Sequence, residues 1–152
     1  MEHTAKASPH LRLHIVGDGA RVTDKLRALM ENDNVIYHGP LSEARVSRLL
    51  RSIHFAIMPH LRDEVSTYMN PLKVLMYAAH GLRSVAVDVP GLNNIDGLHV
   101  VDTSDAFTKQ ILAWVKDVRE GSFIPLDVPK NMPKSAEKYV ALVNSEHPVN
   151  SI

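Results

Sequence analysis

Short apolar runs with a high share of β-branched residues alternate with segments of helical spacing along most of this chain. The strand-like runs occupy residues 11–16, 34–38, 55–58, 84–87 and 98–101. Apolar residues recur three or four positions apart in residues 20–30, 43–53, 71–80 and 104–120. Alternation of this kind predicts a parallel sheet with helices on both faces, joined by right-handed crossovers. We therefore expect an α/β fold, with ligand contacts at the carboxyl ends of the strands.

The chain length suits one domain with a substantial core, since 152 residues are available. We expect a polar N-terminal segment over residues 1–10, the α/β domain over 11–121, and an irregular tail over 122–152. Pro125, Pro129 and Pro133 disfavour regular structure in the first part of the tail. Residues 135–143 have the pattern of a last short helix.

Charge and residue usage argue against several classes of function. Lysine plus arginine and aspartate plus glutamate each number 17, and zero net charge argues against a general nucleic-acid or membrane-surface binder. The chain has no cysteine, and its histidines lack metal-site spacing, so no metal is expected. No apolar run approaches the roughly 18 residues of a transmembrane segment. The first residues also lack the apolar core of a signal peptide, so we expect a cytoplasmic protein.

The helix expected after the third strand carries a lysine where helix electrostatics disfavour one. Asn70 is a good N-cap, Pro71 suits the first helical position, and Gly81 can end the helix in a left-handed conformation. Lys73 therefore falls in the first turn, where the positive end of the helix dipole repels a cation and attracts an anion. A helix N-terminus beside an ammonium group predicts a phosphate site, with a solvated lysine that points away as the alternative.

Four segments in order resemble the C-terminal, donor-binding domain of GT-B fold glycosyltransferases. These segments are LHIVGDG, NVIYHGPLS, FAIMPH and NPLKVLMYAAHGLRSVAV. The stretch from Leu72 to Tyr77 is also similar to the xanthan glucuronosyltransferase-like branch. The resemblance implies a Rossmann-like parallel sheet. It further implies transfer of a hexosyl or glucuronosyl group from a UDP-sugar in bacterial polysaccharide or glycan synthesis.

The resemblance also assigns roles in nucleotide-sugar binding. Lys73 would bind the diphosphate, in agreement with the helix-terminus argument, and His60 would contact the donor. The other residues expected at the site are Leu72, Asn70, Pro71, Tyr68, Gly17, and the base-flanking His38, Gly39 and Pro40. The nucleotide-sugar is the substrate, and no cofactor is implied.

One departure from the family pattern bears on activity. The larger family of retaining enzymes has a Glu-x7-Glu pair, whereas this chain has Met76 at the second position and Tyr68 eight residues before it. Neither side chain can hold a sugar hydroxyl as a carboxylate does. The departure points to an inverting relative or to lost activity, and no catalytic residue is predicted within this chain.

The resemblance implies that parts of the whole enzyme are missing from this sequence. A complete donor-binding domain would begin one βα unit earlier, and a separate N-terminal domain supplies the acceptor site and commonly the catalytic base. We expect a fragment, or a reduced protein that pairs with another chain, inactive alone and peripheral to the inner membrane in the full-length enzyme. A missing first strand also predicts an exposed sheet edge and self-association.

Two alternative functions stay open. A GT-B-like module without donor binding would be a non-catalytic binding or scaffolding protein, as Met76 and the missing unit suggest. Half of a sugar-nucleotide epimerase, which shares the GT-B fold, would also need a partner domain. An intact catalytic carboxylate and base would favour the epimerase, and neither is evident in the sequence.

Overall fold

The computed structural model describes the chain over residues 11–17, 23–59, 72–87 and 95–127. The strands are β1 (Leu13–Ile15), β2 (Val35–Tyr37), β3 (Phe55–Met58), β4 (Arg83–Val87) and β5 (Leu98–Val101). The helices are α2 (Asp24–Met30), α3 (Glu43–Leu50), α4 (Leu72–Ala79) and α5 (Ser104–Glu120). The N-terminal segment and the helix expected over residues 135–143 lie outside the described residues.

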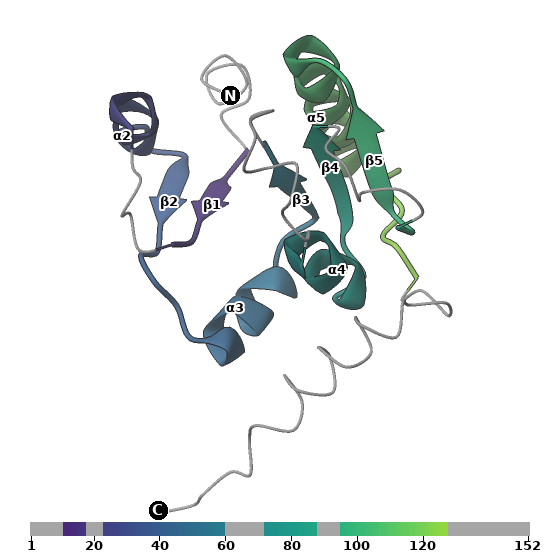
Figure 1. The fold of residues 1–152 in the computed structure, drawn as a ribbon. Coiled ribbons are helices and arrows are strands. Elements are labelled where there is room, and N and C mark those ends of the chain that lie inside the picture. The colour runs from purple at the N-terminus through teal and green to yellow at the C-terminus, as the bar shows by residue number, and fades with distance from the viewer. Residues whose placement is uncertain (1–10, 18–22, 60–71, 88–94, 128–152) are drawn as a thin grey trace, which may run out of the picture.

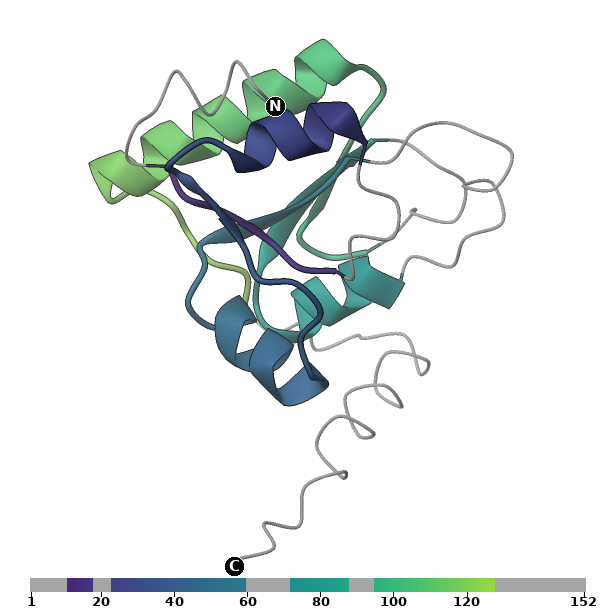
Figure 2. The same cartoon turned by 90° about the vertical axis from the view of Figure 1, so that its left-hand side faces the viewer.

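The strands form two parallel sheets (Figure 1). β1 pairs with β2, with Leu13 opposite Val35. β3, β4 and β5 form the second sheet in that order, with Ile57 opposite Val85 and Val85 opposite His99. Helices α2 and α5 lie on one side of the strands and α3 and α4 on the other, as both views show (Figures 1 and 2). The predicted α/β class, with parallel strands and helices on both faces, is confirmed.

Capping residues set the helix ends. The Thr23 hydroxyl accepts a hydrogen bond from the backbone N–H of Leu26 at 3.3 Å, so α2 begins at Asp24. This start lies later than the predicted residue 20. The Thr103 hydroxyl accepts in the same way from Ala106 at the start of α5. Gly121 ends α5 with a φ of 69°, which glycine adopts without strain.

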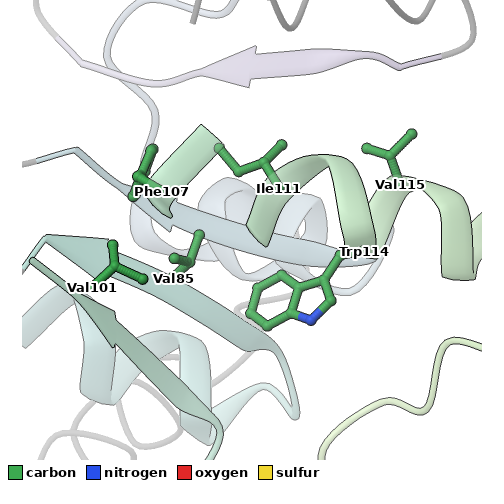
Figure 3. Packing of buried hydrophobic residues seen from close by; sticks show 6 residues of the cluster. All are labelled: Val85, Val101, Phe107, Ile111, Trp114 and Val115. Atoms are coloured by element: carbon green, nitrogen blue, oxygen red, sulfur yellow. The ribbon is translucent and has the colours of Figure 1, made fainter. Parts of the chain in front are cut away.

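The largest buried cluster joins the β3–β4–β5 sheet to α5 (Figure 3). Its members are Val85, Val101, Phe107, Ile111, Trp114 and Val115. The Trp114 ring meets the Phe55 ring edge-on, with centroids 5.3 Å apart. On the opposite face, Met58, Val74 and Ala86 form a smaller cluster beneath α4. Burial on both faces explains why Val85, Ala86 and Val87 follow one another in β4 without the polar alternation of a half-exposed strand.

Residues 122–127 carry no helix or strand and pack back onto the domain. The N–H of Leu126 donates to the carbonyl oxygen of Gly81 at 3.1 Å, and the Phe123 ring lies 6.1 Å from the Trp114 ring. Gly97 has a φ of 75°, and a Cβ at this position would collide with the Leu126 side chain. The segment therefore packs closely because residue 97 is glycine.

The packing of α5 predicts a large loss of stability on truncation of its tryptophan. Trp114 is 6% exposed, and Trp114→Ala is expected to lower the free energy of unfolding by about 3–5 kcal/mol, because it leaves a cavity in the core. Leu112→Ala, at a 37% exposed position of the same helix, is the control and should cost about 0.5 kcal/mol or less. Urea unfolding followed by circular dichroism measures both. Equal losses in the two variants would contradict this packing.

Candidate functional site

After β2, the chain reverses the direction in which it adds strands across the row. From β1 the chain crosses through α2 to β2, and from β2 it returns through α3, past β1, to β3 (Figure 1). The helices α2 and α3 lie on opposite faces, as right-handed crossovers in opposite directions require. In open α/β sheets, ligands bind at the carboxyl ends of the strands that flank such a reversal. Here those strands are β1 and β3.

Two of the predicted site residues are joined where β1 and β2 end. The N–H of Gly17 donates to the carbonyl oxygen of Gly39 at 3.0 Å, and Gly39 has a left-handed φ of 65°. The Tyr37 hydroxyl donates to the carbonyl oxygen of Gly17 at 2.7 Å. Sequence reasoning missed Tyr37, whose role depends on the β1–β2 register. Pro40 follows in an exposed position, and the two turns are held together as one unit.

The predicted residue His38 is paired with His14 of β1. Nδ1 of His14 lies 2.9 Å from Nε2 of His38, and the stacked rings have centroids 5.2 Å apart. One ring must donate and the other accept, so the hydrogen bond requires at least one neutral ring. Burial lowers the pKa of His14, and the charges of His38 and Arg12 lower it further. His14 is therefore neutral at pH 7.

This lowered pKa predicts that stability falls in mild acid. The folded protein favours neutral His14, so the unfolded chain takes up the proton more readily. The free energy of unfolding should then keep its full value above about pH 6.5, the pKa of a histidine in the unfolded chain, and decrease as the pH falls below this value. His14→Gln should show a shallower decrease than the wild type, measured by urea unfolding between pH 7.5 and 5.5.

A control separates this effect from the general loss of a histidine. His54→Gln removes an exposed histidine that follows α3. Parallel pH profiles for the wild type and His14→Gln would show that His14 does not cause the acid sensitivity.

Lys73 is exposed in the first turn of α4, beside Leu72, which is 46% exposed. This turn has no acidic residue to offset the ammonium charge. The positive end of the helix dipole adds to the same potential, so the start of α4 favours an anion. The remaining predicted contacts, Asn70, Pro71, His60 and Tyr68, lie outside the described residues.

A cavity of about 770 Å³ lies between β1 and β3 and reaches Lys73. His14 and Val16 line it from β1, and Phe55 and Ile57 line it from β3. Residues of α3 and α4 bound one face of this cavity, and residues of α5 bound the other. The other described site residues, Leu72, Gly17, His38, Gly39 and Pro40, are outside its lining. The structure thus brings Lys73 and His14 to one cavity, and His14 connects it to the turn at His38.

A serine–histidine pair on the cavity wall joins α3 to α4. Nδ1 of His80 lies 2.8 Å from the backbone carbonyl oxygen of Met76, which can only accept, so Nδ1 carries the proton. Nε2 is then the acceptor for the Ser47 hydroxyl, 2.8 Å away. No sequence signal could have found this pair, because it depends on how α3 packs against α4.

The side chain of Met76 belongs to the apolar packing between these helices. Met76 and Tyr77 pack against the buried cluster of Leu50, Ala56 and Leu82. Burial also raises the pKa of the Tyr77 phenol. An unpaired carboxylate at position 76 would lie against this apolar cluster at considerable cost.

The serine–histidine pair predicts a measurable contribution to stability. Ser47→Ala removes the donor and leaves Nε2 of His80 half-buried without its partner, so we expect a loss of about 1 kcal/mol in the free energy of unfolding. Ser52→Ala is the control, because the Ser52 hydroxyl makes an exposed bond to the carbonyl oxygen of Leu49. Urea unfolding of both variants tests this. A loss in Ser47→Ala no greater than in Ser52→Ala would show that the pair adds nothing.

Two kinds of feature are absent from the described ranges. No group of three or more histidine, aspartate or glutamate side chains there could hold a metal ion. None of the helices in that part of the chain is long and apolar enough to span a bilayer.

A family model described as "Glycosyl transferases group 1" matches residues 1–117. This range includes all five strands, the reversal between β1 and β3, and Lys73. A comparison with curated proteins found no match.

Proposed function

Because the chain belongs to the group 1 glycosyltransferases, we propose that it binds the nucleotide-sugar donor of a sugar-transfer reaction at the carboxyl edge between β1 and β3. Lys73 is the observation that carries this proposal. Its ammonium group is exposed in the first turn of α4 without an acidic neighbour in that turn, and it borders the cavity at the strand reversal. A bound diphosphate would offset both the lysine charge and the positive end of the helix dipole.

The proposed chemistry is displacement at the anomeric carbon of the donor sugar. An oxygen of the acceptor forms a bond to this carbon and gives its proton to a base, while the bond to the nucleoside diphosphate breaks and negative charge grows on the departing phosphate oxygen. Lys73 and the start of α4 stabilise that charge, as fixed positive groups do in transition states. Met76 stands where the retaining enzymes have their second glutamate, and this supports an inverting reaction, in which the base and the acceptor site come from another domain or chain.

The donor proposed is a UDP-sugar used in bacterial polysaccharide or glycan synthesis. The similarity of Leu72–Tyr77 to the xanthan glucuronosyltransferase-like branch supports this choice and suggests hexosyl or glucuronosyl transfer. The linked turns at Gly17 and Gly39 suit contacts with the nucleobase of the donor, and His38 adds a ring nitrogen close by. The remaining proposed contacts are Leu72, Pro40, Asn70, Pro71, His60 and Tyr68.

A second candidate is a non-catalytic binding or scaffolding module. The placement of Met76 in an apolar cluster favours it, because that position offers no polar contact to a sugar. This candidate predicts a folded protein that binds no nucleotide.

Calorimetric titration with UDP and with GDP tests the donor proposal. We expect UDP to bind more tightly than GDP, and Lys73→Ala to weaken UDP binding about 10- to 100-fold, the scale of a lost charge-assisted contact. Lys109→Ala, which removes an exposed lysine of α5, should bind as the wild type does.

Two results would contradict this assignment. Binding of neither nucleotide by the folded wild type would favour the scaffolding module. Equal affinities of Lys73→Ala and Lys109→Ala for the bound nucleotide would remove Lys73 from the site.

A further inference from the structure

The turn that follows β1 is bonded to the end of β2 by backbone and side-chain groups together. The N–H of Gly17 donates to the carbonyl oxygen of Gly39 at 3.0 Å. The carbonyl oxygen of Gly17 accepts from the Tyr37 hydroxyl at 2.7 Å. Just before these turns, Nδ1 of His14 lies 2.9 Å from Nε2 of His38. Gly17 thus has both its backbone donor and its backbone acceptor bonded to groups at the end of β2.

The side chains that make these bonds lie on opposite faces of the β1–β2 sheet. Val35 belongs to the buried cluster beneath α2, and Tyr37, two residues further along β2, lies on the same face. Leu13 and Ile15 of β1 also pack against that cluster, so His14 between them lies on the other face. Tyr37 and the histidine pair therefore hold the turn from opposite faces.

The position of Tyr37 indicates a local role for its hydroxyl. Tyr37 is 38% exposed, whereas Val35 on the same face is 8% exposed. An exposed hydrogen bond adds little to the free energy of unfolding, because water competes for both of its groups. Its effect is to fix the orientation of the Gly17 carbonyl relative to β2. The turns at Gly17 and Gly39 consequently have little freedom to move relative to each other.

We propose that Tyr37 is a positioning residue of the nucleobase site, because its hydroxyl and the His14–His38 pair together hold the turns at Gly17 and Gly39 at a fixed spacing. This inference rests on the proposed function, which assigns the nucleobase of the donor to these two turns. A site that already has its binding conformation loses less conformational freedom when the ligand binds. A rigid site also discriminates between nucleobases of different size, because it cannot repack around each of them. Tyr37 needs no contact with the donor for either effect.

A variant without the hydroxyl tests the positioning role. Tyr37→Phe removes one hydrogen bond and keeps the aromatic ring, and UDP and GDP binding by the full chain is measured by calorimetric titration. We expect Tyr37→Phe to weaken UDP binding about 3- to 10-fold, the scale of one hydrogen bond. It should weaken GDP binding less, so the preference for UDP narrows. Lys73→Ala should instead weaken both nucleotides alike, because both carry the diphosphate.

Ser52→Ala is the matched control for the loss of a hydroxyl group. The Ser52 hydroxyl also donates to a backbone carbonyl oxygen at 2.7 Å in an exposed position, but it does so just after α3. This variant should bind both nucleotides as the wild type does. Weakening of UDP binding by Ser52→Ala equal to that by Tyr37→Phe would contradict a specific role for Tyr37.

Amide hydrogen exchange, followed by NMR without nucleotide, measures how firmly the turns are held. The N–H of Gly17 should exchange about 5-fold faster or more in Tyr37→Phe than in the wild type, because its bond to Gly39 then opens more often. The N–H of Leu126, which donates to the carbonyl oxygen of Gly81 at 3.1 Å, is the reference and should keep its exchange rate. Equal acceleration at both amides would indicate a general loss of stability and would overturn the local role.

A double variant tests whether Tyr37 and the histidine pair act on the same turn. His14→Leu removes the ring nitrogen that pairs with His38. If both side chains hold one turn, either of them still holds it when the other is lost. Tyr37→Phe combined with His14→Leu should therefore weaken UDP binding more than the product of the two single effects. A double effect equal to that product would show that the two act independently.

The results separate this inference from the proposed function. If UDP binds and Lys73→Ala weakens it, but Tyr37→Phe binds UDP as the wild type does, only the positioning role fails. Equal weakening of UDP and GDP by Tyr37→Phe, or an unchanged exchange rate at Gly17, would overturn that role as well. If the folded wild type binds neither nucleotide, the proposed function fails and the positioning role fails with it.

Discussion

Each parallel strand presents two rows of backbone donors and acceptors. The architecture depends on the place between β1 and β3, where two such rows have no strand partner among the described residues. One row of β1 bonds to β2, and one row of β3 bonds to β4. The other rows border the same cavity, which α3, α4 and α5 enclose on its two faces. The described part of the chain therefore bonds its strands in two separate sheets. The position of the candidate site follows from this division.

The residues that line the cavity between β1 and β3 differ in chemistry from one part of it to another. Between the strands its walls carry the apolar side chains of Ile57, Ile111 and Val115. At one end stands Lys73, while the paired His14 links the wall to the turn at His38. A nucleoside diphosphate needs positive charge and hydrogen-bond donors. It therefore fits the part of the cavity near Lys73 and not the apolar part between the strands.

Local rules predicted the elements well and the polar pairs poorly. The strands over 55–58 and 98–101 have the predicted bounds, and Gly81 and Gly121 are left-handed after their helices, because turn chemistry and apolar patterning act over short distances. The strand expected over 11–16 shortens to Leu13–Ile15, since only these residues have partners in β2. Pairs such as Ser47–His80 depend on helix packing, which no spacing in the sequence records. The place of Lys73 in the first turn of a helix was predicted because capping residues and the helix dipole are local properties. Several of its proposed neighbours in the site lie outside the described residues.

The residues of the candidate donor site lie on two different sheets. Lys73 lies on α4, which packs on the β3–β4–β5 sheet, whereas Gly17 and His38 belong to the β1–β2 sheet. No backbone bond fixes one sheet against the other among the described residues. Side-chain packing, such as that of Leu11 against the cluster that contains Val85 and Trp114, therefore sets the separation between these two groups of residues. A nucleotide that contacts both groups must fit the separation that this packing allows.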